Sequence, residues 1–260
     1  MSLTQGSDTT TANSIPRMKS EELTPSTFDS VYSGRQPVIV SGVVSQWKAY
    51  RLWSAEYLRG LFKNVTTNLK YNERGIFDLH DSVYQKINFS DAVDLILSEN
   101  GSRYSVQQQA LLASFPELLN DIDLPYLINS NKQMKVVNLW FGGRGYKSPL
   151  HYDGLHNLFA QVVGAKRMIL FPPDETSNLY PFRDKSRAHC SQLDIFNPNE
   201  QSFPGYARAR LKRIDVHVEP GELLYVPLGW WHAVESLDVS VSINFWWTVK
   251  ANARQAPKSH

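Results

Sequence analysis

The chain has 260 residues, of which 42% are hydrophobic and 12% aromatic, so it can bury a substantial core, and disorder is excluded as its general state. Its 27 Lys and Arg residues against 25 Asp and Glu give a formal charge of +2, which excludes a global basic field of the kind that binds nucleic acids or anionic membranes. The single cysteine, Cys190, excludes an internal disulfide and a cysteine-rich zinc module, and it fits a reducing compartment.

Residues 1–19 are polar, with almost no large apolar side chains, and cannot offset the entropy of ordering. We predict a flexible tail there, without the apolar segment of a signal peptide. No later apolar run approaches the roughly 20 residues of a membrane-spanning helix, so no membrane partner is expected. The sequence predicts a cytoplasmic or nuclear protein.

Residues 20–130 alternate between β-rich and helical patterns. The run at 36–40 is short and β-rich, whereas 54–63 and 90–98 have the spacing of amphipathic helices. Ser90 stands where it can cap the second helix. We predict an N-terminal layer of helices and strands over this part of the chain.

From about residue 131 the pattern changes to short β-rich runs broken by Gly and Pro, at 135–141, 158–163, 166–171, 214–218, 223–226 and 239–247. This spacing favours a mainly β fold, a small barrel or double-sheet sandwich over residues 131–249, braced by the N-terminal layer. Residues 250–260 form a basic tail with few apolar side chains for a helix pair, so we expect a monomer.

A candidate metal site is carried by two nearby residues and one distant residue. His151 and Asp153 stand at i and i+2, and in an extended chain this spacing sends both side chains to one face. His232 follows a Gly-Trp-Trp turn and begins a strand-like run. Two histidines and one carboxylate form the facial triad of non-haem Fe(II) oxygenases, which leaves coordination positions open. An isolated HxD triplet often arises by chance, so the neighbouring residues decide its meaning.

Lys166 shares an alternating face with Met168 and Leu170. A buried ammonium group is costly unless it is paired, which points to the carboxylate of a ligand, although a lysine at a strand end with its head in solvent explains the pattern as well. The alternation in 239–247 gathers polar side chains and one Trp on a single face that suits a pocket: Ser240, Ser242, Asn244 and Trp246.

The remaining candidates are weaker. Several His and Asp residues stand in loop or solvent-facing contexts and are not expected to bind metal: Asp78, His80, Asp81, His156, His189 and His217. The run at 208–213 is locally basic and could meet a phosphate backbone, but such a run is more often a solvated strand edge. The aromatic residues Tyr152, Trp230 and Trp246 could clasp a peptide, cage a methylated cation or belong to the core.

Six ordered blocks surround these candidates: SPLHYD at 148–153, NLFAQ at 157–161, GAKRMILFPP at 164–173, PGELLYVP at 220–227, WWH at 230–232 and SINFWW at 242–247. They resemble the Jumonji C or cupin-8 group of Fe(II)- and 2-oxoglutarate-dependent oxygenases, strongly over 131–249 and weakly over 36–130. Within the group, the nearest resemblance is to the asparaginyl hydroxylase of hypoxia-inducible factor and to the Jumonji arginyl hydroxylases.

The resemblance implies a double-stranded β-helix, the jelly-roll barrel of the cupins, with an N-terminal helical layer. It assigns iron to His151, Asp153 and His232, and it implies 2-oxoglutarate and O₂ as cosubstrates. It also assigns a set of cosubstrate-pocket residues: Lys166, Ser148 and Tyr104 at the distal carboxylate, and Asn157, Asn244 and Trp246 along the wall.

The function that we predict is hydroxylation of a protein or peptide side chain. A demethylase uses the same iron chemistry on an N-methyl group and stays open as an alternative. A hydroxylase of a modified tRNA base is kept open by the basic run at 208–213. A non-catalytic cupin-like interaction module is disfavoured, because it would have no physical need to keep the triad, Lys166 and Asn244 together.

Overall fold

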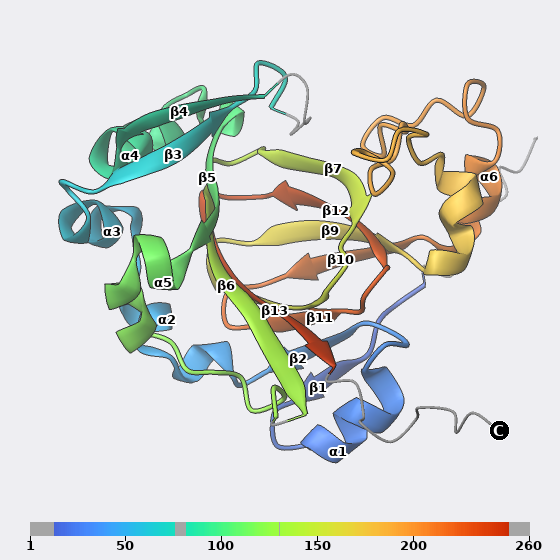
Figure 1. Cartoon of the computed structure of the whole chain (residues 1–260), viewed down its shortest axis with the longest axis horizontal. Coiled ribbons are helices and arrows are strands. Elements are labelled where there is room, and N and C mark those ends of the chain that lie inside the picture. Colours follow the sequence, from blue (N-terminus) through green and yellow to red (C-terminus); the bar gives the residue numbers. More distant parts are fainter. Residues whose placement is uncertain (1–12, 76–81, 130, 250–260) are drawn as a thin grey trace, which may run out of the picture.

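The computed structural model describes residues 13–75, 82–129 and 131–249. Within these ranges the chain forms two sheets that face each other (Figure 1). The large sheet has the strand order β1-β2-β11-β8-β13-β6-β5-β3-β4, and the small sheet has the order β10-β9-β12-β7. The mainly β jelly-roll architecture predicted from the sequence is confirmed.

The strands pair antiparallel throughout, except for the parallel pair β1 and β2. Those of the large sheet are β1 (Arg17–Lys19), β2 (Val38–Ser41), β11 (Leu223–Val226), β8 (His156–Val163), β13 (Ser240–Val249), β6 (Lys132–Gly142), β5 (Tyr104–Ala110), β3 (Thr66–Tyr71) and β4 (Val83–Asn88). Those of the small sheet are β10 (Ile214–Val218), β9 (Lys166–Phe171), β12 (Trp231–Ser236) and β7 (Lys147–Tyr152).

Short helices cover the outside of the barrel, most of them from the first half of the chain (Figure 1). The α-helices are α1 (Pro25–Thr27), α2 (Lys48–Leu52), α3 (Ala55–Leu61), α4 (Phe89–Leu97), α5 (Leu111–Ser114) and α6 (Tyr206–Ala209). The remaining helical turns are η1 (Phe28–Tyr32), η2 (Val44–Gln46), η3 (Gly101–Arg103), η4 (Pro116–Asn120), η5 (Pro173–Leu179) and η6 (Arg210–Lys212).

The two helices expected in the first half are present as α3 and α4. Ser54 caps α3, because its side chain accepts a hydrogen bond from the backbone N–H of Tyr57. The cap predicted for α4 is wrong: the N-cap position belongs to Asn88, and Ser90 lies inside the first turn with its hydroxyl directed to the carbonyl of Lys63. The helix begins earlier because Phe89 is fully buried and continues the apolar face of α4.

The N-terminal layer is part of the barrel wall. β5 pairs with β6, and β3 and β4 extend the same sheet beyond it (Figure 1). One hydrophobic core joins the helices of this layer to the outer face of the large sheet, through residues such as Phe62, Phe89, Phe141, Leu158 and Ile243. Burial of this shared core is what holds the layer in place.

Between the sheets the interior has two sides. Where β10, β11 and β2 approach each other it is filled by apolar side chains, including Ile39, Val216, Leu224 and Val226. Toward β7 and β5 it opens into a cavity of about 420 Å³. The three candidate metal ligands, Lys166 and Asn244 line this second side.

Candidate functional site

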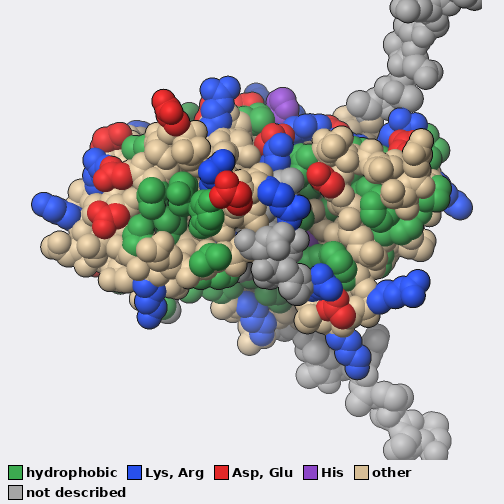
Figure 2. Space-filling view, turned by 90° about the horizontal axis from the view of Figure 1, so that it is seen from above, with side chains coloured by type: hydrophobic (Ala, Val, Ile, Leu, Met, Phe, Trp, Pro, Cys, Tyr) green, Lys and Arg blue, Asp and Glu red, His purple; other side chains and the backbone are tan. Residues whose placement is uncertain are grey.

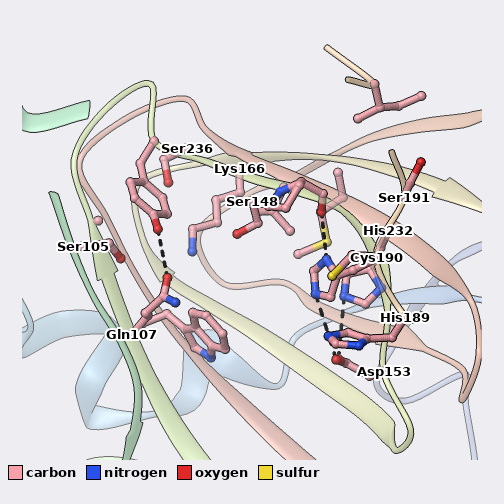
Figure 3. A pocket seen from close by; sticks show the side chains of 18 of the residues that line it. Ser105, Gln107, Ser148, Asp153, Lys166, His189, Cys190, Ser191, His232 and Ser236 are labelled. Atoms are coloured by element: carbon pink, nitrogen blue, oxygen red, sulfur yellow. Dashed lines mark hydrogen bonds and ion pairs between the residues drawn. The ribbon is translucent and has the colours of Figure 1, made fainter. Parts of the chain in front are cut away.

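The three predicted metal ligands meet on the cavity side of the small sheet (Figure 3). His151 lies on β7 directly opposite His232 on the neighbouring strand β12, and Asp153 follows β7. Asp153 Oδ1 lies 4.0 Å from His151 Nε2, and Asp153 Oδ2 lies 3.7 Å from His232 Nε2. Their ligand atoms all lie within 4.8 Å of one another, which is the spacing that a single ion can bridge.

Backbone carbonyls orient both imidazole rings. The Nδ1 atom of His151 lies 2.8 Å from the carbonyl of Pro149, and that of His232 lies 3.1 Å from the carbonyl of Trp230. Donation from Nδ1 leaves the Nε2 lone pair of each ring facing Asp153, as metal ligation requires. Burial, and then the neighbouring His232, lower the pKa of His151 to about 4, so this ring is neutral and able to ligate near neutral pH.

Lys166 lies at the opposite end of the cavity from the triad (Figure 3). Its side chain is buried, donates from Nζ to Ser242 Oγ at 2.9 Å and lies 5.1 Å from the centre of the Phe159 ring. Burial lowers the pKa of this ammonium group to about 7. Among the described residues no carboxylate pairs with Lys166, so the cavity offers a buried cation to an anionic ligand.

The other predicted wall residues, with one exception, line the same cavity: Ser148, Asn157, Asn244 and Trp246. Asn157 Oδ1 and Trp246 Nε1 are buried and have no hydrogen-bond partner within the described part of the chain. Buried polar atoms without partners are costly, so a polar ligand is the natural occupant. The donor set therefore fits a divalent metal at one end and an anionic, oxygen-rich cosubstrate along the wall.

Tyr104 is the exception, because it is not among the residues that line this cavity. Along β5 the side chains alternate, so Ser105 and Gln107 face the cavity while Tyr104 packs against Tyr71 with ring centres 5.2 Å apart. Two other tyrosines line the cavity: Tyr84 on β4 and Tyr146 in the turn before β7. Tyr146 is buried and donates its hydroxyl to Gln107 Oε1 at 3.0 Å.

Two of the three aromatic residues named as a clasp or cage lie away from the cavity. Tyr152 points to the outside of the barrel, where its ring packs against that of Trp231 with ring centres 4.9 Å apart. Trp230 is buried in the apolar core between the sheets. Trp246 does line the cavity. The strand period explains Tyr152, because the residue between two inward ligands must point outward.

Sequence reasoning missed several cavity residues, chiefly Tyr146, Gln107, Trp140 and those of the segment between β9 and β10. Within that segment the backbone of 189–191 pairs with the free edge of β7, which brings His189 and Cys190 to the cavity (Figure 3). Local periodicity contains no signal for such a contact. It is set by the path of a long loop over the barrel.

The remaining sequence candidates lie elsewhere. Asp78, His80 and Asp81 fall outside the described residues. His156 is not in a loop: it begins β8, is buried, and its Nδ1 lies 2.8 Å from the Tyr225 hydroxyl. His217 is exposed on β10, as predicted.

The basic run at 208–213 is largely paired with acidic side chains. Lys212 lies 2.7 Å from Asp174, Arg213 lies 2.6 Å from Asp215, and Arg210 contacts Glu200. Figure 2, which looks onto the side of the molecule at the top of Figure 1, shows Lys and Arg interspersed with Asp and Glu and no single-sign field. These contacts favour the interpretation of the run as a solvated surface over a phosphate-binding one.

The chain matches a known protein family over most of its length. Residues 24–253 match the family described as a cupin-like domain. The chain is 31% identical over 217 residues to the lysine-specific demethylase 8 of Xenopus tropicalis, which covers 82% of this chain and 48% of that protein. It is 32% identical over 243 residues to the protein of the same name in Danio rerio, covering 90% and 56%, and 32% identical over 222 residues to the lysine-specific demethylase JMJ30 of Arabidopsis thaliana, covering 84% and 51%.

The chain spans about half the length of the curated relatives it matches. Among the described residues, no helix is both long enough and apolar enough to cross a membrane.

Proposed function

Because the chain belongs to the cupin-like, Jumonji C family of Fe(II)- and 2-oxoglutarate-dependent dioxygenases, we propose that it uses this chemistry to hydroxylate a side chain of a protein or peptide. One observation carries the enzymatic part of the proposal. A two-histidine, one-carboxylate triad and a buried lysine without a carboxylate partner among the described residues face each other across one cavity.

His151, Asp153 and His232 would hold the iron, and Lys166 would anchor the distal carboxylate of 2-oxoglutarate. When bound, iron and 2-oxoglutarate supply the oxidising chemistry that inserts one atom of O₂ into a C–H bond, with succinate and CO₂ as co-products. The chain would contribute position: three protein ligands would hold the metal at one end of the cavity, and the buried walls would exclude water from the reacting groups.

At the distal carboxylate, we propose that Tyr146 replaces Tyr104. Tyr146 and Gln107 form a hydrogen-bonded pair at the Lys166 end of the cavity, and Ser148 lies on the same lining. A carboxylate there would accept charge-assisted hydrogen bonds from Lys166 and from hydroxyl groups, which are stronger than neutral ones. Asn157, Asn244 and Trp246 would contact the remainder of the cosubstrate.

Hydroxylation is preferred over demethylation on the basis of the aromatic residues. The three aromatic residues that could cage a methylated cation do not surround one point of the cavity, because Tyr152 and Trp230 point away from it and only Trp246 lines it. Demethylation remains the second candidate. It is favoured by the names of the relatives and by the cavity's own aromatic wall, which includes Trp140 and Trp246.

The two reactions leave different products, so one experiment separates them. The protein would be incubated with Fe(II), 2-oxoglutarate and a library of unmodified and methylated peptides, followed by mass spectrometry and a formaldehyde assay. Hydroxylation yields a peptide heavier by one oxygen and no formaldehyde. Stoichiometric formaldehyde with loss of a methyl group would overturn the proposed hydroxylation. Succinate formation that does not depend on Fe(II) would contradict the proposed enzymatic activity as a whole.

We further propose that residues 20–130 and 131–249 act as one catalytic unit. The support is the pairing of β5 with β6 and the core that both parts share. Limited proteolysis that released a folded 131–249 fragment would contradict this. A monomeric state and a cytoplasmic or nuclear location stay predictions of the sequence.

A further inference from the structure

Trp140 and Asn244 make a directional contact in the cavity wall. They lie on the neighbouring strands β6 and β13, and Trp140 Nε1–H donates to Asn244 Oδ1 at 2.9 Å. An indole nitrogen only donates, so this bond settles which end of the amide is which: the oxygen faces Trp140 and the NH₂ group points elsewhere. Asn244 is 1% exposed, so bulk water does not compete for its amide.

The position of Asn244 along β13 relates it to the anchor lysine. Lys166 donates to Ser242, which precedes Asn244 by two residues and therefore lies on the same face of the strand. Two residues of an antiparallel strand span about 7 Å, a length comparable to that of a five-carbon dicarboxylate. A diacid anchored at Lys166 and Ser242 would thus extend its other end to the amide of Asn244.

We propose that Trp140 is a positioning residue for the cosubstrate: it holds Asn244 with its NH₂ group toward the keto-acid carboxylate of 2-oxoglutarate. This inference rests on the proposed function, because it takes 2-oxoglutarate as the ligand. Without the indole N–H the amide can turn, and a turned amide places its carbonyl oxygen against an anionic oxygen. Trp140 acts through Asn244 and need not touch the ligand.

Ligand binding to the Mn(II)-loaded protein tests this without turnover. Calorimetry would compare 2-oxoglutarate with 4-oxopentanoate, which has the distal carboxylate and the keto group but carries a methyl group in place of the keto-acid carboxylate. In Trp140→Phe the ring stays and only the donor is lost, so 2-oxoglutarate should bind about tenfold more weakly while 4-oxopentanoate binding stays within about twofold. Equal weakening of both ligands would indicate a general disturbance of the cavity and overturn the inference.

Trp53→Phe is the matched control. Trp53 Nε1–H also donates to a side-chain oxygen, Asp121 Oδ2 at 3.0 Å, but neither residue lines the cavity. The same chemical deletion is made at a buried tryptophan, so any effect on folding is comparable. Both ligands should bind this variant as they bind the wild type.

A double-mutant cycle separates positioning from direct contact. In an Asn244→Ala background the amide is gone, so adding Trp140→Phe should cause no further loss of 2-oxoglutarate affinity. An additive loss would show that the tryptophan acts on the ligand itself, which contradicts the proposal.

A measurement on the wild type guards against a variant that fails to fold. The indole ¹⁵N–H signal of Trp140 should stay protected from solvent exchange with and without 2-oxoglutarate, because the bond to Asn244 persists. Rapid exchange on binding would overturn the proposal. If the wild-type protein binds no 2-oxoglutarate, the proposed function is contradicted as well. If the wild type binds 2-oxoglutarate and Trp140→Phe binds it equally well, only the positioning role of Trp140 is contradicted.

Discussion

The two sides of the barrel interior are built from the same strands but have opposite chemistry. On β9, Leu170 belongs to the apolar cluster that also contains Val216 and Leu224, whereas Lys166, four residues earlier on the same face, lines the cavity. The apolar side lies toward β10 and β11, and the cavity lies toward β7 and β5. Stability and ligand binding are therefore separated across the width of the barrel.

The cavity side carries groups that weaken the ligand-free fold. Lys166 is a buried cation, and Asn157 and Trp246 carry buried polar atoms without partners among the described residues. Each such group costs free energy unless a ligand pairs with it. The apolar side offsets these costs by burial, so changes on the two sides should have opposite signatures.

The largest effect is expected from Asp153→Ala. The substitution removes the only carboxylate of the triad, so iron-dependent succinate formation should fall to the background level. Asp153 lies in the cavity and not in a packed core, so the free energy of unfolding of the metal-free protein should change by less than about 1 kcal/mol. Metal content, succinate and urea unfolding would be measured together. Retained activity would mean that the iron lies elsewhere.

Lys166→Ala should weaken 2-oxoglutarate binding by on the order of 2–5 kcal/mol, because it leaves the distal carboxylate buried and unpaired. The measurement is the concentration of 2-oxoglutarate that gives half-maximal succinate formation. Lys166→Met, which keeps the length of the side chain, should lose the same affinity and unfold at a higher temperature than the wild type without ligand, because the buried charge is gone. Unchanged 2-oxoglutarate affinity in both variants would show that Lys166 does not bind the cosubstrate and is only a buried residue at a strand end.

Leu224→Ala, on the apolar side, should show the reverse pattern. Leu224 is fully buried between Ile39 and Phe159, so its truncation should lower the free energy of unfolding by about 2–5 kcal/mol. The affinity of the folded protein for Mn(II) should stay unchanged, as measured by calorimetry below the melting temperature. A loss of metal affinity would show that the two sides are coupled through β8 and β11.

Features that arise from alternation along a single strand could be predicted from the sequence. Alternation located His151 and Asp153 as a pair, Lys166 among inward apolar residues, and Asn244 with Trp246 on one face of β13. Contacts between distant loops could not be predicted, such as the pairing of 189–191 with β7 or the arrival of Tyr146 in the cavity. Long-range packing sets these contacts, and no local period records it.

Tyr104 shows how a motif can indicate a residue that the phase of its strand directs away from the cavity. Its role came from the resemblance, but the phase of β5 directs Ser105 and Gln107 inward, and the pairing of β5 with β6 is irregular between Val106 and Gln109. A one-residue shift in a strand exchanges the two faces. For Tyr152, strand alternation decides among the three open alternatives in favour of the core, because the inward pair His151 and Asp153 requires Tyr152 to point outward.

Taken per pH unit, the smallest effect is a dependence of stability on pH that only the cavity side should show. Burial lowers the pKa of Lys166 from 10.5 to about 7, so between these values the unfolded chain binds more protons than the folded one. The stability of the ligand-free protein should therefore rise with pH across this window, by at most about 1.4 kcal/mol per pH unit, and Lys166 should contribute no slope below about pH 7. Urea unfolding of the wild type and of Lys166→Met at several pH values isolates the contribution of Lys166, since the variant lacks the titrating group and should lose this slope.

The pH dependence of 2-oxoglutarate binding should have the opposite sign, because the carboxylate of 2-oxoglutarate pairs with the protonated amine. Above about pH 7 complex formation takes up a proton, and the affinity should fall by up to about tenfold per pH unit. Parallel slopes for the wild type and Lys166→Met would show that the buried lysine keeps its proton without a ligand, and that the polar side of the barrel costs the fold less than its buried charge indicates.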